Sequence, residues 1–120
     1  MKRISKTLLL LFIISIIVGC QKEEKVDDEI DVKLTNTETY SRIIVSGDEE
    51  GAVIKTQAKN YEKSEIIRNE TTNMNVVYKY KPIADFVGKD YVIIEIHYNK
   101  TGVAEDVDTK TLKINFTVSK

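Results

Sequence analysis

The clearest pattern in the sequence is an alternation of apolar and polar side chains in two segments near its C-terminal end. The apolar positions are Val92, Ile94, Ile96 and Tyr98 in one segment and Leu112, Ile114, Phe116 and Val118 in the other. A period of two residues is typical of strands that bury one face. The two segments, joined by a loop over 99–109, therefore predict an antiparallel hairpin. Since each strand has one apolar face, a second sheet must cover it, which predicts a β-sandwich.

Shorter segments upstream supply the other strands. They are 40–45, 52–56, 65–68 and 76–82, bounded by turn residues such as Gly47 and by Pro82. The polar stretch 57–64 fits either a loop or one helical turn. The segment 85–90 is predicted as a turn, with Gly88 at positive φ. No segment sustains the 3.6-residue period of a helix, so we predict one all-β domain over 37–120, an antiparallel sandwich of six to seven strands.

The N-terminal segment is organised differently. A basic head of Lys2, Arg3 and Lys6 precedes an apolar run over 8–18. Eleven or so residues are too few to span a bilayer, which takes roughly twenty, and they suit the core of a cleaved export signal. Immediately after the run come Ile17, Val18, Gly19 and Cys20, the single cysteine of the chain.

These four residues resemble the lipobox of bacterial lipoproteins. The resemblance implies removal of residues 1–19 and attachment of diacylglycerol to the Cys20 thiol, followed by a further acyl chain such as palmitate on the new terminus. Membrane attachment would then come from two or three acyl chains, which anchor stably where one does not. The alternative is an ordinary secretory signal in which Cys20 is incidental.

The residues after Cys20 are almost entirely charged, and we predict a flexible tether over 20–36. Its first residues, Gln21, Lys22, Glu23 and Glu24, resemble the acidic surface-export tag of Bacteroidota lipoproteins, commonly Gln-Lys-Asp-Asp-Glu. This sequence has Glu where Asp is usual, and Lys25 at the last place. The resemblance implies an outer-membrane lipoprotein displayed at the cell surface. The alternatives are the periplasmic face of that membrane and a stretch that only spaces the domain from the bilayer.

A second resemblance concerns the domain itself. Tyr80, Pro82, Phe86, Gly88 and Asp90 are similar to the Tyr-x-Pro…Phe-x-Gly-x-Asp signature of bacterial immunoglobulin-like and cadherin-like surface domains. The resemblance implies an immunoglobulin-like sandwich, in which Phe86 plugs the core, Gly88 turns the chain and Asp90 opens the next strand. These roles are structural, and fold by itself does not fix function.

Charge and candidate chemistry narrow the function classes. Without residues 1–19 the chain has 15 basic and 19 acidic side chains, so we expect no nucleic-acid partner. His97, the single histidine, falls on the polar face of a strand beside Glu95 with no recognisable nucleophile. We expect no cofactor and no metal site. Two acidic groups are candidates for cation ligands: the pair Asp85 and Asp90 and, as the alternative place, the loop that holds Glu105, Asp106 and Asp108.

These observations predict a non-enzymatic, lipid-anchored envelope or cell-surface protein whose sandwich is a binding or structural module. Its membrane contact is through the lipid on Cys20, and a protein or glycan ligand is left open. One alternative is an accessory glycan-binding lipoprotein of a nutrient-uptake complex, in which Tyr61, Tyr91 and Tyr98 would stack on sugar rings. Another is a small inhibitor or immunity-type lipoprotein.

Overall fold

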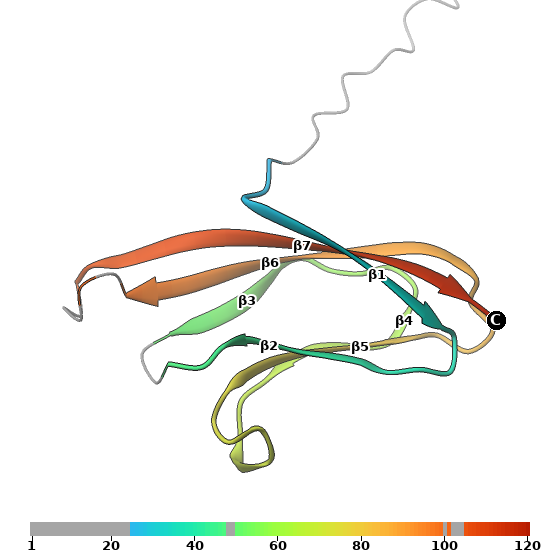
Figure 1. Ribbon diagram of the computed structural model, residues 1–120, viewed down its shortest axis with the longest axis horizontal. Coiled ribbons are helices and arrows are strands. Elements are labelled where there is room, and N and C mark those ends of the chain that lie inside the picture. The colour runs from blue at the N-terminus through green and yellow to red at the C-terminus, as the bar shows by residue number, and fades with distance from the viewer. Residues whose placement is uncertain (1–24, 48–49, 100, 102–104) are drawn as a thin grey trace, which may run out of the picture.

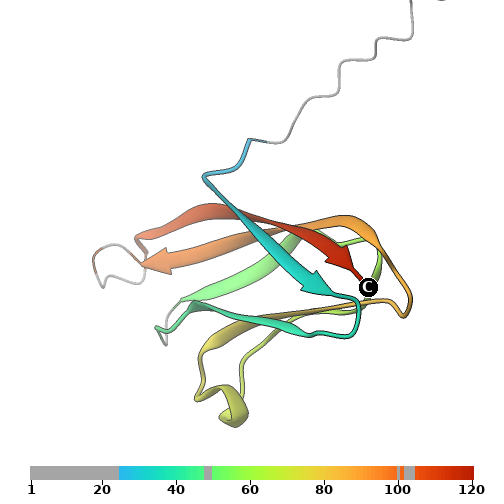
Figure 2. The ribbon, with the colours of Figure 1, turned by 45° about the vertical axis from the view of Figure 1, so that its right-hand side comes forward.

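The chain forms two β-sheets packed face to face (Figures 1 and 2). The structure is a computed structural model that describes residues 25–47, 50–99, 101 and 105–120. Its strands are β1 (Asp28–Thr35), β2 (Tyr40–Val45), β3 (Gly51–Thr56), β4 (Tyr61–Ile67), β5 (Val76–Pro82), β6 (Gly88–Asn99) and β7 (Val107–Ser119). One sheet has the order β1-β7-β6-β3 and the other β2-β5-β4. The predicted all-β sandwich of six to seven strands is confirmed.

The predicted hairpin is the largest unit of the fold. β6 and β7 pair antiparallel from Gly88↔Val118 to Asn99↔Val107. The inward side chains of both strands are buried: Val92, Ile94, Ile96, Leu112, Ile114, Phe116 and Val118. Ile93 alternates outward, yet it is only 2% exposed, because it lies between Thr56 and Lys113 on the neighbouring strands. The outer face of the four-stranded sheet is therefore mostly polar, with Ile93 covered and Val53 exposed.

Aromatic rings join the two sheets at the centre of the core. The Tyr80 ring of β5 stacks on Phe116 of β7 with centroids 3.9 Å apart and an 8° interplanar angle. Tyr40 of β2 meets the same Phe116 ring edge-on at 5.6 Å. Phe116 thus packs against two strands of the opposite sheet, and its edge-on contact with Tyr40 has a geometry that stabilises beyond simple area burial.

The predicted tether over 20–36 is wrong in its second half. Residues 28–35 form β1, which pairs in parallel with β7 from Asp28↔Leu112 to Thr35↔Ser119. Ile30, Val32 and Leu34 face the core, and Leu34 is fully buried. The charged residues between them point outward, and their density hid the alternation of an edge strand. The domain therefore begins near Asp27 rather than at residue 37, and β1–β7 is its one parallel pair.

The strand order places β1 differently from the first strand of a constant-type immunoglobulin sandwich. In a constant-type immunoglobulin sandwich the first strand lies beside the second, giving sheets 1-2-5-4 and 3-6-7. Here β1 lies instead beside β7, and β2 is left as the edge of its sheet. Bulges interrupt the pairing of β2, β3 and β4 with their neighbours, and bulged edges resist pairing with other chains.

Two local predictions need correction. β4 begins at Tyr61 rather than at residue 65, because Ser64 faces inward and its polarity concealed the strand. After β4 the chain forms a short 3-10 helix, Glu70–Thr72, capped by the Asn69 side chain. Gly88 has the predicted positive φ of 144°, but it already belongs to β6, and Asp85 is the left-handed residue of the turn before it.

Candidate functional site

Asp90 is the centre of a buried polar cluster at one end of the sandwich. It is 6% exposed, and its carboxylate accepts hydrogen bonds from the Lys59 and Asn60 backbone N–H groups at 2.9 and 2.8 Å. It also accepts from the Tyr80 hydroxyl at 3.0 Å and from the Tyr91 N–H at 2.9 Å. Four donors compensate the burial of this charge. Asp90 therefore fastens the β3–β4 connection to β5 and β6.

The other motif residues surround this point. Tyr80 and Pro82 are fully buried at the end of β5. Phe86 packs against the core, and its ring lies 3.4 Å from where a Cβ on Gly88 would stand. The five residues thus form one corner of the sandwich.

A second polar cluster lies inside the three-stranded sheet. The Ser64 hydroxyl is 2.7 Å from the Tyr78 hydroxyl and donates to Gln57 Oε1 at 2.5 Å. The Gln57 amide donates back to the Ser64 carbonyl at 3.1 Å. Burial raises the pKa of the Tyr78 hydroxyl, and burial together with the Asp90 carboxylate raises that of Tyr80. Both phenols therefore stay protonated and serve as hydrogen-bonding groups.

His97 lies on the outer face of the four-stranded sheet. Its Nε2 is 3.1 Å from the Glu95 carboxylate, and Thr109 is its cross-strand neighbour. Within the described part of the chain, no hydrogen bond joins the imidazole to the Thr109 hydroxyl, and the pair stands on a half-exposed sheet surface. A hydroxyl without a hydrogen-bonded base lacks the activation that nucleophilic catalysis needs.

The acidic candidates do not converge. Asp85 is exposed in its turn whereas Asp90 is buried, so these two carboxylates do not form a pair. Asp108 accepts a hydrogen bond from the Tyr98 hydroxyl at 3.3 Å, while Glu105 and Asp106 are exposed. Among residues 25–47, 50–99, 101 and 105–120 there is no group of three or more His, Cys, Asp or Glu side chains that could hold a metal ion.

The three tyrosines considered for sugar stacking are separated by the fold. Tyr61 is on β4 of the three-stranded sheet, while Tyr91 and Tyr98 are on β6 of the other. Tyr91 faces outward with the Lys113 ammonium 4.7 Å from its ring centroid. Tyr98 alternates inward and is partly buried. The three rings do not form one stacking platform.

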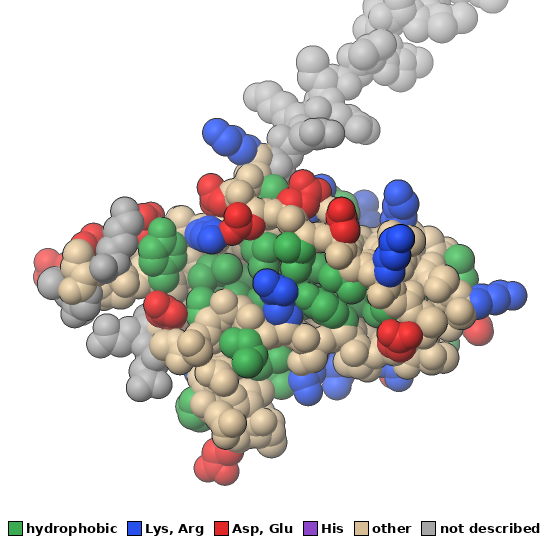
Figure 3. Space-filling model, in the orientation of Figure 1, with side chains coloured by type: hydrophobic (Ala, Val, Ile, Leu, Met, Phe, Trp, Pro, Cys, Tyr) green, Lys and Arg blue, Asp and Glu red, His purple; other side chains and the backbone are tan. Residues whose placement is uncertain are grey.

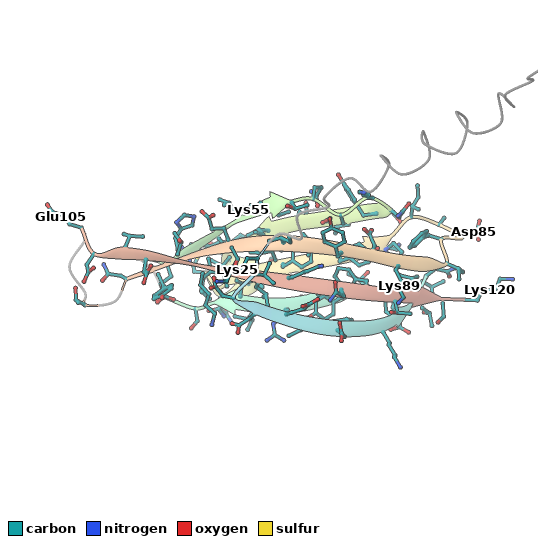
Figure 4. All side chains as sticks on the ribbon, turned by 90° about the horizontal axis from the view of Figure 1, so that it is seen from above. Lys25, Lys55, Asp85, Lys89, Glu105 and Lys120 are labelled. Carbon is teal, nitrogen blue, oxygen red and sulfur yellow. The ribbon has the colours of Figure 1, made fainter. Side chains whose placement is uncertain are left out.

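A hollow that the sequence did not reveal lies on the outer face of the four-stranded sheet. It has a volume of about 450 Å³, and its lining includes Asp31 and Lys33 of β1, Lys89 and Tyr91 of β6, and Asn115 and Thr117 of β7. Figure 4 looks onto this face, with Lys89 labelled. Only the strand pairing brings these residues together. The hollow is half open and has a mixed polar and apolar lining, which suits binding rather than enclosing a reaction.

A groove of about 290 Å³ runs along the open edge between β1 and β2. It is lined by the apolar side chains Ile30, Ile43, Ile44, Ile96 and Leu112 and by charged groups such as Arg42. Figure 3 shows apolar side chains gathered between the two sheets on this side. The groove follows from the displacement of β1 to the edge of β7, which leaves the core less covered here.

The lipobox and the export-tag residues lie outside the described residues. These are Ile17, Val18, Gly19, Cys20, Gln21, Lys22, Glu23 and Glu24. Within the described part of the chain no helix is long and apolar enough to cross a membrane.

Comparison with known proteins assigns no family. No family model matches the chain, and no curated protein matches it. Among solved structures it is similar to part of an endo-fucoidan hydrolase of glycoside hydrolase family 107, with a TM-score of 0.45 and 13% sequence identity. The match covers 77% of this chain and 13% of that protein. Likeness at this level does not extend to function.

Proposed function

We propose that this chain is a lipid-anchored protein of the bacterial outer membrane, displayed at the cell surface, whose sandwich is a non-catalytic binding or structural module. The anchor is supported by Ile17, Val18 and Gly19 before Cys20. The observation that best supports a non-catalytic module is that the buried polar side chains form structural hydrogen bonds. Ser64 and Asp90, the fully buried polar residues of the described chain, both form hydrogen bonds that hold strands and loops together.

The surface chemistry supports the same proposal. An acyl-transfer or hydrolytic site needs a nucleophile, a base that contacts it and donors for the developing charge. His97 has a carboxylate neighbour, but it faces solvent on a flat sheet with no hydrogen-bonded hydroxyl among the described residues. The hollow and the outer sheet faces are open surfaces, which fit recognition of another molecule.

Replacing the single cysteine tests the anchor. We expect Cys20→Ser to abolish labelling by a fatty-acid analogue and to release the protein from the membrane fraction, because no other thiol is present. Gly19→Ala, which keeps a small residue before the cysteine, is the matched control and should retain label. Undiminished labelling of Cys20→Ser would refute lipid attachment at this position.

Display is tested separately. Replacing Lys22, Glu23 and Glu24 with Ala should leave fatty-acid labelling intact and move the protein to the inner face of the outer membrane. A protease added to whole cells would then spare the variant and degrade the parent. Equal degradation of both proteins would show that this stretch is a spacer only and remove the sequence support for surface display.

A further inference from the structure

The chain leaves the fold at a fixed point on β7. The Asp27 N–H donates to Thr111 Oγ1 at 3.0 Å. In return, the Thr111 N–H and hydroxyl donate to Asp27 Oδ2 at 2.8 and 3.0 Å. Beside this pair, Lys110 Nζ lies 2.6 Å from the Asp28 carboxylate. These contacts hold the chain to the sheet from Asp27 onward, so the stretch between Cys20 and the fold is much shorter than 20–36.

A short tether restricts how the domain can stand on a membrane. Seven Cα–Cα steps from Cys20 to Asp27 reach about 25 Å when fully extended and about 15 Å on average if flexible. The thirteen residues of β7 alone span roughly 40 Å. Under the lipid anchor proposed above, on which this step rests, the point of exit is held nearer to the bilayer than the length of the sandwich.

The direction of exit selects one face. In Figures 1 and 2 the described chain rises from the side of the four-stranded sheet, partway along its length and opposite the three-stranded sheet. In Figure 4, Lys25 lies over the outer face of this sheet rather than beyond its ends. Turning the three-stranded sheet to the bilayer would need the tether to pass around the whole sandwich. The outer face of the four-stranded sheet is therefore the one nearest the anchor.

The hollow on this face contains a row of two lysines and a hydroxyl. Thr117 of β7 is the register partner of Lys33 on β1 and of Lys89 on β6. All three point outward, because Leu34, Asp90 and Phe116 next to them are buried. The two lysine Cα atoms are two strand spacings apart, roughly 10 Å, so their long side chains can reach one anion between them.

The two lysines favour an anion between them. Within the described part of the chain, neither Lys33 nor Lys89 forms an ion pair. The Asp31 carboxylate also lines the hollow and keeps its charge, but it is turned to the Asn115 amide, which donates to Glu29 at 2.6 Å and to Asp31 at 3.0 Å. Lysine is a common ligand of phosphate, and a hydroxyl adds a donor.

We propose that the hollow between Lys33 and Lys89 takes the phosphate of an anionic lipid headgroup, so that the outer face of the four-stranded sheet lies against the membrane that holds the anchor. The acyl chains supply attachment, and the two lysines set orientation. The three-stranded sheet then faces away from the bilayer and is free for a partner. Lys79 and Lys81, which point outward from β5 in that sheet, serve as the lysines with which Lys33 and Lys89 are compared.

Lysine labelling on vesicles tests the orientation. The lipoprotein, extracted from cell membranes, is reconstituted in vesicles of phosphatidylcholine alone or of equal parts phosphatidylcholine and phosphatidylglycerol. An amine-reactive reagent is applied, and each lysine is quantified by mass spectrometry. On the anionic vesicles we expect Lys33 and Lys89 to react about five-fold more slowly than in detergent, from the attraction of lysines to anionic surfaces. Lys79 and Lys81 should react as in detergent.

Three controls make the result decisive. Salt at about 1 M shortens the screening length to about 3 Å and should remove the protection. Lys113, on the same face, should also be protected in the parent protein. Lys33→Gln with Lys89→Gln should abolish that protection, whereas Lys79→Gln with Lys81→Gln should not. If the chain carries no acyl group, the free Cys20 thiol is coupled to a maleimide lipid, so orientation is measured even when the proposed anchor fails. Equal reactivity of the two faces, or protection unaffected by lipid charge and salt, would overturn the proposal.

Discussion

The β6–β7 hairpin and β1 belong to the same sheet but are held in place by different interactions. The hairpin buries eight apolar side chains, seven of them facing inward, and forms the centre of the core. β1 has one fully buried side chain, Leu34, and otherwise presents charged residues to solvent. It is held by its parallel pairing with β7 and by polar contacts at its start, such as Asp27 with Thr111.

The difference shows that the core and the edge strand of one sheet are stabilised by different kinds of interaction. The core fold depends on burial, which is large and hardly depends on salt or pH. β1 and the residues at its start depend on hydrogen bonds and exposed charges, which are individually weak. Changes in the hairpin should therefore threaten folding, while changes in β1 should affect its docking first. Four substitutions test this, from the largest expected effect to the smallest.

The core of the hairpin should show the largest loss. Phe116→Ala removes a ring that is 1% exposed and contacts Tyr80 and Tyr40. We expect a cost of about 3–5 kcal/mol in the free energy of unfolding, measured by denaturant titration. Ile43→Ala, at a side chain that is 57% exposed, is the control and should cost below about 1 kcal/mol. A similar small cost for Phe116→Ala would contradict the assignment of this core.

The buried carboxylate should come next. Asp90→Asn keeps the shape but turns an amide N–H₂ toward some of the four donors that now point at Asp90. We expect a loss of about 3 kcal/mol, since bonds to a charged group are strong and a buried donor left without a partner is costly. Asp85→Asn, at an exposed left-handed position that Asn tolerates, is the control. Equal stabilities of these two variants would mean that Asp90 does not fasten the corner.

The sequence predicted the hairpin better than it predicted this corner. The inward positions of β6 and β7 are large and apolar at every second residue, so local pattern alone was enough. Asp90 could be placed at a strand opening by resemblance, but its partners Lys59 and Asn60 are thirty residues away. Contacts of that kind depend on how the two sheets meet, which no local pattern records.

β1 and the hollow were missed for related reasons. Ile30, Val32 and Leu34 do alternate, but the charges between them are typical of a solvated tether as well as of an edge strand. The hollow needs the parallel pairing of β1 with β7, because this pairing puts Lys33 beside Thr117. Since a parallel pair joins residues far apart in sequence, the candidate site could not be seen before β1 was recognised.

Leu34 tests directly whether β1 is part of the domain. If residues 20–36 were a tether, Leu34→Ala would have no effect on stability. Because Leu34 is 6% exposed and lies in the core cluster, we expect a loss of about 2 kcal/mol, the lower end of the range for leucine truncations. Lys33→Ala, its outward neighbour, should be nearly neutral. Unchanged stability of Leu34→Ala in denaturant titration would restore the longer tether.

The smallest effect is expected where the chain leaves the sheet, and it should depend on pH. Hydrogen bonds from Thr111, with smaller contributions from Lys110, lower the pKa of the exposed Asp27 carboxyl below its ordinary value of 3.8. A lowered folded-state pKa contributes stability that is fully present above the unfolded value and is lost as pH falls through the folded value. Asp27→Asn should therefore hold β1 slightly less firmly than the parent protein does at neutral pH. This difference between the two proteins should disappear as pH falls below 3.8. Hydrogen exchange of the β1 amides is the suitable measurement, because local release of an edge strand need not unfold the core. We expect the β1 amides of Asp27→Asn to exchange faster than those of the parent at neutral pH, with no change elsewhere. If the two proteins differed by the same amount at neutral pH and below pH 3.8, the Asp27 carboxylate would be excluded as the group that holds this end of β1.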